Sequence, residues 1–135
     1  MTGFLVDTNL VSEQTKRRPH PVVSSWLLQG EDRYMSVLSF GELSRGARLL
    51  APSDPVFAKR LRTWVDGLRT EYSGRILPVD EMVMESWAAI PTTRTLPTID
   101  GLLAATALAH DLTIATRNVA DFEGTGARIF NPFAE

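Results

Sequence analysis

The stretch Leu102–Ala109 limits the possible folds of this chain more than any other feature. It reads Leu-Leu-Ala-Ala-Thr-Ala-Leu-Ala and carries no charge. A helix that is apolar nearly all round must be covered on most sides by other elements. The stretch is also far shorter than the about 20 apolar residues that cross a bilayer. We therefore expect a deeply buried helix over residues 98–110, capped at its end by His110, in a domain with elements packed around it.

Short apolar segments typical of buried strands alternate with segments of helical periodicity along the rest of the chain. Strands are predicted over residues 4–6, 33–36, 75–79, 113–116 and 127–130. Helices are predicted over residues 22–28, 39–50, 55–72, 81–90 and 98–110. Strands separated by helices predict an α/β domain with a mostly parallel sheet. The 135 residues fit a single domain spanning residues 1–135.

The composition excludes several kinds of site. The chain has no cysteine, which excludes disulfides, thiolate zinc sites and cysteine nucleophiles. Its two histidines, His20 and His110, are far apart in sequence, so a histidine-ligated zinc site has little support. The net charge of −2 does not indicate a strongly basic nucleic-acid binder. No signal peptide or membrane span is recognisable, so we expect a cytoplasmic protein with no membrane partner.

Polar residues follow two predicted strands at the point where each strand ends. Asp7 comes directly after the strand 4–6, and the segment Thr116–Asn118 follows the strand 113–115. Ligands of open α/β sheets bind at the carboxyl ends of the strands. Asp7 could instead be a helix cap, although Thr8 and Asn9 are also suited to that role. If the two strands are neighbours, we expect both polar segments to lie at one edge of the sheet.

Two further acids lie on predicted helices. Glu42 shares a half-apolar stripe of the helix 39–50, which predicts partial desolvation, although a solvent-facing position fits equally well. Asp100 lies in the first turn of the buried helix, where the helix dipole alone favours an acid and where Thr98 is expected to be the cap. Asp7, Glu42 and Asp100 together predict a site for a hard cation, Mg²⁺ or Mn²⁺, which activates water and holds a phosphodiester oxygen.

Other phosphate-handling proteins with acids at strand ends fit the sequence poorly. A phosphotransfer receiver domain needs adjacent acids after the first strand and a lysine after a late one, but the lysines here are Lys16 and Lys59. A haloacid-type phosphatase needs a second acid where this chain has Asn9. A glycine-rich loop that would cradle a nucleotide is also missing from the sequence.

A set of short motifs resembles a known family in order and spacing. The motifs are Leu5–Asn9, Ser39–Leu43, Asp100–Ala107, Thr116–Asn118 and Asn131–Phe133. With these motifs the chain resembles PIN-domain proteins, in particular the VapC toxins of toxin–antitoxin pairs and their FitB-like branch. The resemblance spans nearly the whole chain.

The resemblance implies a PIN fold with three α/β/α layers and the toxin component of a type II, VapBC-like system. The implied activity is an endoribonuclease that uses Mg²⁺, or alternatively Mn²⁺, to hydrolyse RNA. The implied partners are RNA, a VapB-like antitoxin and a second copy of the chain in a homodimer. Trp64, on the predicted helix 55–72, could serve the dimer, the antitoxin or core packing.

The resemblance also implies the site residues. Asp7, Glu42 and Asp100 match the family's acids, with Asp7 and Asp100 as the metal ligands. The family's fourth acid corresponds to Asn118, which is uncharged, and Asp121 is the nearby acid that could replace it.

The remaining implied residues surround these acids. Thr8, Asn9 and Thr116 are expected to orient the acids, and Arg117 and Arg45 to hold RNA phosphates. The alternative is a PIN-like nucleic-acid-binding protein with weak or no catalysis, which acts through partner binding.

Overall fold

The computed structural model describes residues 3–30 and 32–134. Its strands are β1 (Phe4–Val6), β2 (Arg33–Ser36), β3 (Ile76–Leu77), β4 (Thr113–Ala115) and β5 (Arg128–Phe130). They form one sheet in the order β3-β2-β1-β4-β5, and every pairing is parallel. This arrangement confirms the predicted α/β class and the fifth strand. The third strand is shorter than predicted because Pro78 follows it, and proline cannot donate to a strand ladder.

The predicted helices are all present, with ends that differ by one or two residues. The α-helices are α1 (Thr8–Ser12), α2 (Pro21–Leu27), α3 (Val37–Leu50), α4 (Pro55–Glu71), α5 (Glu81–Ala89) and α6 (Thr98–Ala109). Two short 3₁₀ helices, η1 (Glu13–Thr15) and η2 (Val119–Phe122), complete the list. His110 is the C-cap of α6, as predicted, but the predicted cap Thr98 is wrong. Pro97 precedes the helix, and no side chain caps it.

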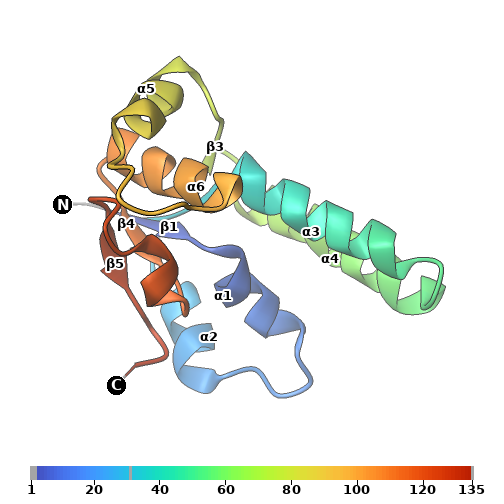
Figure 1. Cartoon of the computed structure of the whole chain (residues 1–135). Coiled ribbons are helices and arrows are strands. Elements are labelled where there is room, and N and C mark those ends of the chain that lie inside the picture. The colour runs from blue at the N-terminus through green and yellow to red at the C-terminus, as the bar shows by residue number, and fades with distance from the viewer. Residues whose placement is uncertain (1–2, 31, 135) are drawn as a thin grey trace.

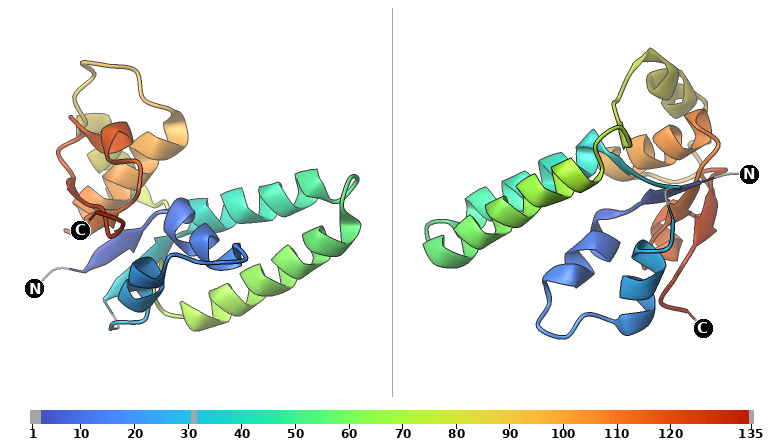
Figure 2. Two further views of the ribbon diagram at one scale, coloured as in Figure 1. Left: turned by 90° about the horizontal axis from the view of Figure 1, so that it is seen from below. Right: turned by 180° about the vertical axis from the view of Figure 1, so that it is seen from behind.

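Side chains alternate between the two faces of the sheet and build a core on each face. Leu5 and Ile114 face a core shared with α5 and α6, which includes Leu103. Val6 faces the opposite core, which packs against α1, α2, α3 and α4. Figures 1 and 2 show these helices on the two sides of the sheet, with the α3–α4 hairpin extending well beyond it. The three predicted layers are therefore confirmed.

The strand register brings the two predicted polar segments together. Val6 pairs with Ala115, so the residues that follow β1 and β4 leave the sheet side by side. The N–H of Asp7 extends the ladder by donating to the Ala115 carbonyl at 2.9 Å. The same edge receives the start of α6, which carries Asp100. Within the described residues, the helices are too short or too polar to cross a membrane.

Candidate active site

Asp7 is fixed at the end of β1 by hydrogen bonds to both carboxylate oxygens. Oδ1 accepts from the Thr8 N–H at 2.7 Å, which makes Asp7 the N-cap of α1 as well as a site residue. Oδ2 accepts from the Thr116 hydroxyl at 2.8 Å and from the Asn9 amide at 3.3 Å. Burial raises the pKa of Asp7, and the charges of Glu42 and Asp121 add to this, although the bonds from Thr116 and Thr8 oppose the rise.

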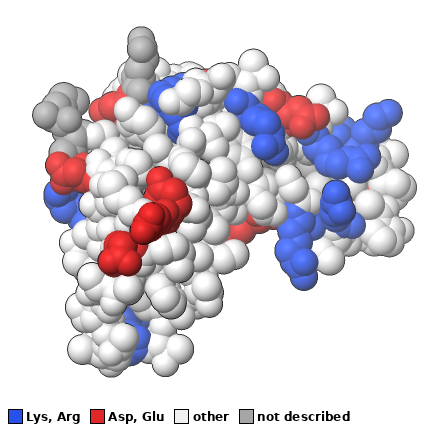
Figure 3. Space-filling view, turned by 90° about the horizontal axis from the view of Figure 1, so that it is seen from above, with Lys and Arg blue, Asp and Glu red and all other residues white. Residues whose placement is uncertain are grey.

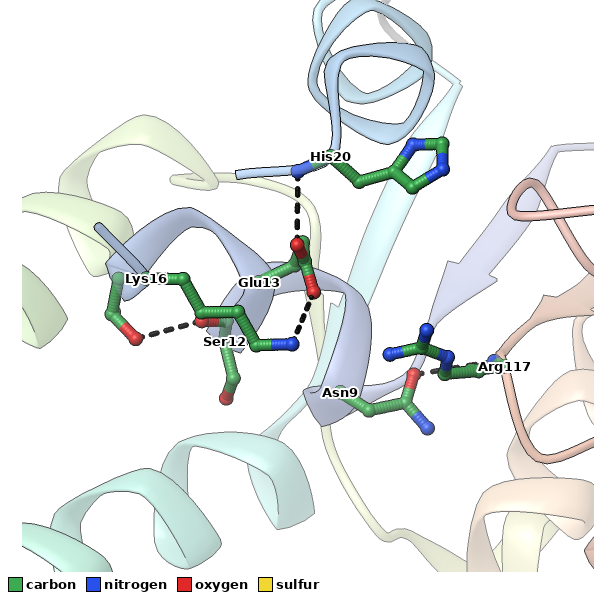
Figure 4. Close-up of polar contacts among 7 residues, drawn as sticks. Asn9, Ser12, Glu13, Lys16, His20 and Arg117 are labelled. Carbon is green, nitrogen blue, oxygen red and sulfur yellow. Dashed lines mark hydrogen bonds and ion pairs between the residues drawn. The ribbon is translucent and has the colours of Figure 1, made fainter. Parts of the chain in front are cut away.

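Thr116 and Asn9 join the ends of β1 and β4 through their side chains. Thr116 is fully buried, and its hydroxyl oxygen also accepts from the Asn9 amide and from the N–H of Asn118, at 3.3 and 3.0 Å. Asn9 accepts in turn from the N–H of Arg117 at 3.3 Å (Figure 4). These contacts hold the Asp7 carboxylate in one orientation.

Glu42 reaches the same place from the second turn of α3. Its Oε1 accepts from the Thr8 hydroxyl at 2.8 Å, so Thr8 contacts Asp7 through its backbone and Glu42 through its side chain. The expected partial desolvation of Glu42 is wrong, because its side chain is exposed. The helix leaves the body of the molecule at this point: Ser39, one turn before Glu42, is buried, whereas Gly46 and Leu49 after it are exposed.

Asp100 completes the group from the first turn of α6. Burial raises its pKa, and the charges of Asp121 and then Asp7 raise it further, whereas the charge of Arg94 lowers it. Asp7, Asp100 and Asp121 therefore lie close enough to repel one another. This mutual repulsion is what a bound cation would relieve.

The turn that follows β4 carries the position of the family's fourth acid. Asn118 is the exposed N-cap of η2, and Asp121 lies in the first turn of that helix. The charge of Asp121 acts on both Asp7 and Asp100. Asp121 therefore supplies a carboxylate to the group, which Asn118 cannot do.

Arg94 connects this turn to the loop that precedes Asp100, a role that the sequence analysis did not predict. One terminal nitrogen, Nη2, donates to the carbonyls of Ala120, Asp121 and Glu123, at 3.0, 3.0 and 2.9 Å. The only available signal was that Arg94 is the one cation in the loop between Pro91 and Pro97.

Arg117 and Arg45, the two cations that we expected to hold RNA phosphates, occupy different surroundings. The guanidinium of Arg117 lies over the Phe133 ring, 4.2 Å from its centroid. Arg45 is exposed on α3, about one turn after Glu42. Arg117 is therefore placed by contact with the C-terminal segment, whereas Arg45 extends into solvent.

A second carboxylate near Asn9 has a structural role that the sequence did not indicate. Glu13 is buried, with 5% of its surface exposed. It accepts from the Lys16 ammonium and from the His20 N–H, both at 2.9 Å (Figure 4). The bond from Lys16, followed by that from His20, lowers the pKa of Glu13. Glu13 thus holds the segment between η1 and α2 against α1.

The oxygen donors suit a hard cation. Across residues 3–30 and 32–134, no three His, Asp or Glu side chains gather closely enough to form a metal cage by themselves. Mg²⁺ commonly binds through one or two carboxylates and keeps several waters. The pair Asp7 and Asp100 fits that pattern, whereas a fully protein-made cage does not.

Comparisons with known proteins place the chain in a family. Residues 4–125 match the PIN domain profile. The chain is 36% identical to Toxin FitB of Neisseria gonorrhoeae, over 96% of this chain and 98% of that protein. It is 32% identical to VapC ribonuclease Y4jK of Sinorhizobium fredii, over 96% and 97%. The crystal structure of FitAcB from Neisseria gonorrhoeae superposes with a TM-score of 0.83 at 33% identity, over 98% of this chain and 99% of that one.

The matched residues include the whole group of polar side chains described above. The profile begins within β1, just before Asp7, and ends after η2, beyond Asp121. Strands β1 to β4 lie inside the matched region, and the structural match to FitAcB covers 98% of the chain. The chain belongs to the PIN-domain family.

Proposed function

We propose that this protein is the toxin of a type II toxin–antitoxin pair and cleaves RNA as a cation-dependent endoribonuclease. The observation that carries the proposal is the group formed by Asp7, Asp100 and Asp121 at the carboxyl edge of β1 and β4, with Glu42 beside it. The relatives named Toxin FitB and VapC ribonuclease support it.

We assign the cation to Asp7 and Asp100, with Asp121 as the acid that takes the place of the uncharged Asn118. Mg²⁺ is the preferred ion and Mn²⁺ the alternative, because both favour carboxylate oxygen and water. When bound, such an ion lowers the pKa of water and stabilises negative charge on a phosphodiester oxygen. Thr116, Asn9 and Thr8 keep the carboxylates of Asp7 and Glu42 oriented toward that ion and its substrate.

Glu42 is the residue best placed to move a proton. Its Oε1 is held by the Thr8 hydroxyl, and its exposed carboxylate takes the proton of the attacking water. The water oxygen bonds to phosphorus as the bond to the 3′ oxygen breaks. The products are a 5′-phosphate and a 3′-hydroxyl, with the leaving oxygen protonated from solvent.

The positive charges for RNA lie mainly on the α3–α4 hairpin. Figure 3 shows Lys and Arg gathered over this hairpin, and Asp and Glu over α5. The cations in the outer part of the hairpin are Arg45, Arg48, Lys59, Arg60 and Arg62. We propose that Arg45, the nearest of these to Glu42 along α3, holds a phosphate, and that Arg117 holds another on the opposite side of the acids.

An antitoxin is the proposed protein partner. Similar solved structures include FitAcB from Neisseria gonorrhoeae and FitAB bound to an IR36 DNA fragment. In this chain, a groove of about 310 Å³ runs between α1, α3 and α4, from Thr8 and Glu42 to Phe57 and Trp64. We propose that an apolar segment of a VapB-like antitoxin lies in this groove. We also propose a homodimer, which light scattering after size exclusion would test.

The non-catalytic alternative has less support from the site. It was suggested by the missing charge at Asn118, but Asp121 contributes a carboxylate from the same turn. The acids Asp7 and Asp100 also have raised pKa values, as is common for groups that bind cations or move protons.

The experiment that tests the proposed function is RNA cleavage by the purified, antitoxin-free protein. We expect total RNA to be cut with Mg²⁺ or Mn²⁺, to stay intact in excess EDTA, and to be cut again when the ion is restored. The Asp7→Asn protein serves as the matched inactive control. Cleavage that persists in EDTA or in Asp7→Asn would contradict the proposal.

A further inference from the structure

A pocket of about 560 Å³ lies between α5, the loop 91–97 and the first turn of α6. Its aromatic wall is Trp87, an indole with 43% of its surface exposed. The other lining residues are Ala88, Ile90, Pro91, Thr92, Arg94, Thr95, Leu96, Pro97, Thr98 and Gly101. The volume lies within the usual range of small-ligand sites. The pocket is separate from the groove near Trp64, and no function has yet been given to it.

The pocket adjoins the acids through a single glycine. A Cβ on Gly101 would lie 3.2 Å from Nε1 of Trp87, a tight contact, so glycine lets the indole lie directly against the first turn of α6. Gly101 follows Asp100 directly and lies in the same helical turn. Arg94, which also lines the pocket, acts through its charge on the Asp100 carboxylate. A group bound in the pocket would therefore lie on the Asp100 side of the acids.

The wall opposite Trp87 is braced. Arg94 lines the pocket, and the three hydrogen bonds of its Nη2 attach the loop to η2, which carries Asp121. The loop 91–97 contains prolines at both ends, which restricts its backbone. Arg94 therefore connects the pocket to the backbone of the turn that carries Asp121.

The chemistry of the lining selects the class of ligand. Among the described residues that line the pocket, none is acidic and one, Arg94, is cationic. The indole and the neighbouring prolines offer apolar surfaces, and Thr92, Thr95 and Thr98 offer hydroxyls that both donate and accept. An unpaired nucleobase matches this combination, because it has an aromatic face, a polar edge and an attached anion.

We propose that this pocket binds an unpaired RNA base next to the scissile phosphate, stacked on Trp87. The inference rests on the proposed ribonuclease function and adds a base-binding subsite to it. A protein segment is the other conceivable occupant, but the adjacent acids would repel an acidic one and bind the phosphate of RNA through their cation. The subsite would limit cleavage to single-stranded RNA, because a paired and stacked base cannot enter.

The decisive experiment removes either the indole of Trp87 or the RNA base that is proposed to stack on it. A random-sequence pool of RNA hexamers first identifies a well-cleaved hexamer. That hexamer is then prepared with one abasic nucleotide on either side of the cut. Stacking of a base on an aromatic side chain predicts that Trp87→Ala raises KM roughly 5- to 150-fold on the intact hexamer. On one side of the cut, we expect the abasic substitution to raise the KM of the wild-type protein by a similar factor. The same substitution should leave the KM of Trp87→Ala almost unchanged.

Two variants keep the experiment interpretable. Trp87→Phe retains an aromatic face and should recover most of the loss on the intact hexamer but should behave like Trp87→Ala on the abasic one. A purely structural role would instead separate Phe from Ala equally on both hexamers. Met82→Ala changes another exposed α5 side chain, 48% exposed, that does not line the pocket, and should leave KM unchanged. Thermal unfolding of each variant checks that it is folded.

The possible outcomes separate the subsite from the proposed function. If the wild-type protein cuts no RNA, the proposed function fails, and binding of the labelled random hexamer pool to Asp7→Asn with and without Trp87→Ala still tests the pocket. The subsite would be overturned if the abasic substitution raised KM by the same factor in the wild-type protein and in Trp87→Ala. Unchanged KM with weakened antitoxin binding would overturn it as well and assign the pocket to a protein segment.

Discussion

Asp7 and the pair Asp100 and Asp121 face the same space but are held in different ways. Asp7 follows a central strand and accepts hydrogen bonds from a backbone N–H and two side chains, Thr116 and Asn9. Asp100 lies at a helix start and Asp121 in a 3₁₀ turn, whose backbone carbonyls accept hydrogen bonds from Arg94. One side of the site is built into the sheet, and the other depends on two connecting segments.

This difference indicates which carboxylates of the site have a fixed position. A carboxylate with several fixed donors cannot reorient without leaving those donors unpaired, so its position is costly to change. Asp100 and Asp121 instead repel each other and Asp7. The nearby charge of Arg94 is the one influence that lowers the pKa of Asp100 against this repulsion. We infer that Asp7 anchors the cation, whereas the other two acids adjust to the ion and the substrate.

The largest expected effect is the loss of the anchored acid. Replacing Asp7 with Asn removes a proposed metal ligand and should reduce the rate of RNA cleavage by more than about 100-fold, since residues that only orient ligands already cost 10–100-fold. Asp121→Asn should cost about 10-fold. The measurement is the initial rate of hexamer cleavage at saturating Mn²⁺. Equal losses in the two variants would remove the distinction between the anchored and the adjustable acids.

The next effect concerns the residue that orients Asp7. Thr116→Val keeps the buried shape but removes the hydroxyl that donates to Asp7 and accepts from Asn9 and Asn118. We expect Mn²⁺ affinity, measured by calorimetry, to fall roughly 10- to 100-fold. Thr116→Ser retains the hydroxyl and is the matched control. An unchanged affinity in Thr116→Val would show that the Thr8 N–H and the Asn9 amide orient Asp7 without the Thr116 hydroxyl.

Arg94→Ala tests the brace on the adjustable side. Loss of the three hydrogen bonds from Nη2 should let η2 shift and move Asp121 away from Asp100, lowering kcat about 10-fold while the protein remains folded. Added guanidinium should restore part of the rate. Arg128→Ala is the control, because Arg128 also bonds a turn carbonyl, that of Asp111, at the other end of the sheet. A similar loss in Arg128→Ala would indicate a general effect on stability.

The residues that could be predicted from the sequence are those whose neighbours are set by the sheet. Asp7 and Thr116 each follow an apolar strand, so the parallel arrangement alone brings them together. Asp100 was also expected, because an acid at the start of an apolar helix is conspicuous. In these cases a local pattern and one rule about strand ends were sufficient.

The remaining features depend on how connecting segments fold back. Arg94 and Trp87 gain their neighbours from the loop 91–97 and from the packing of α5 on α6, neither of which leaves a periodic pattern. The expected desolvation of Glu42 failed because α3 projects away from the sheet, which the stripe on the helix does not reveal. The expected cap Thr98 failed because the chain enters α6 from Pro97.

The smallest expected effect is on stability, and it follows from the raised pKa values of Asp7 and Asp100. The folded protein holds these protons to a higher pH than the unfolded chain does. The two protonated carboxyl groups therefore stabilise the fold at pH values below about 3.8. This stabilisation is lost as the pH rises through their raised pKa values in the folded protein.

In EDTA at neutral pH, Asp100→Asn should then raise the melting temperature by about 2 °C. Mg²⁺ should stabilise the wild-type protein more than this variant, because the ion relieves the same repulsion. Calorimetric melting of both proteins with EDTA and with Mg²⁺ provides the measurement, and a wild type that melts higher than the variant in EDTA would show that Asp100 is not destabilised by its neighbours.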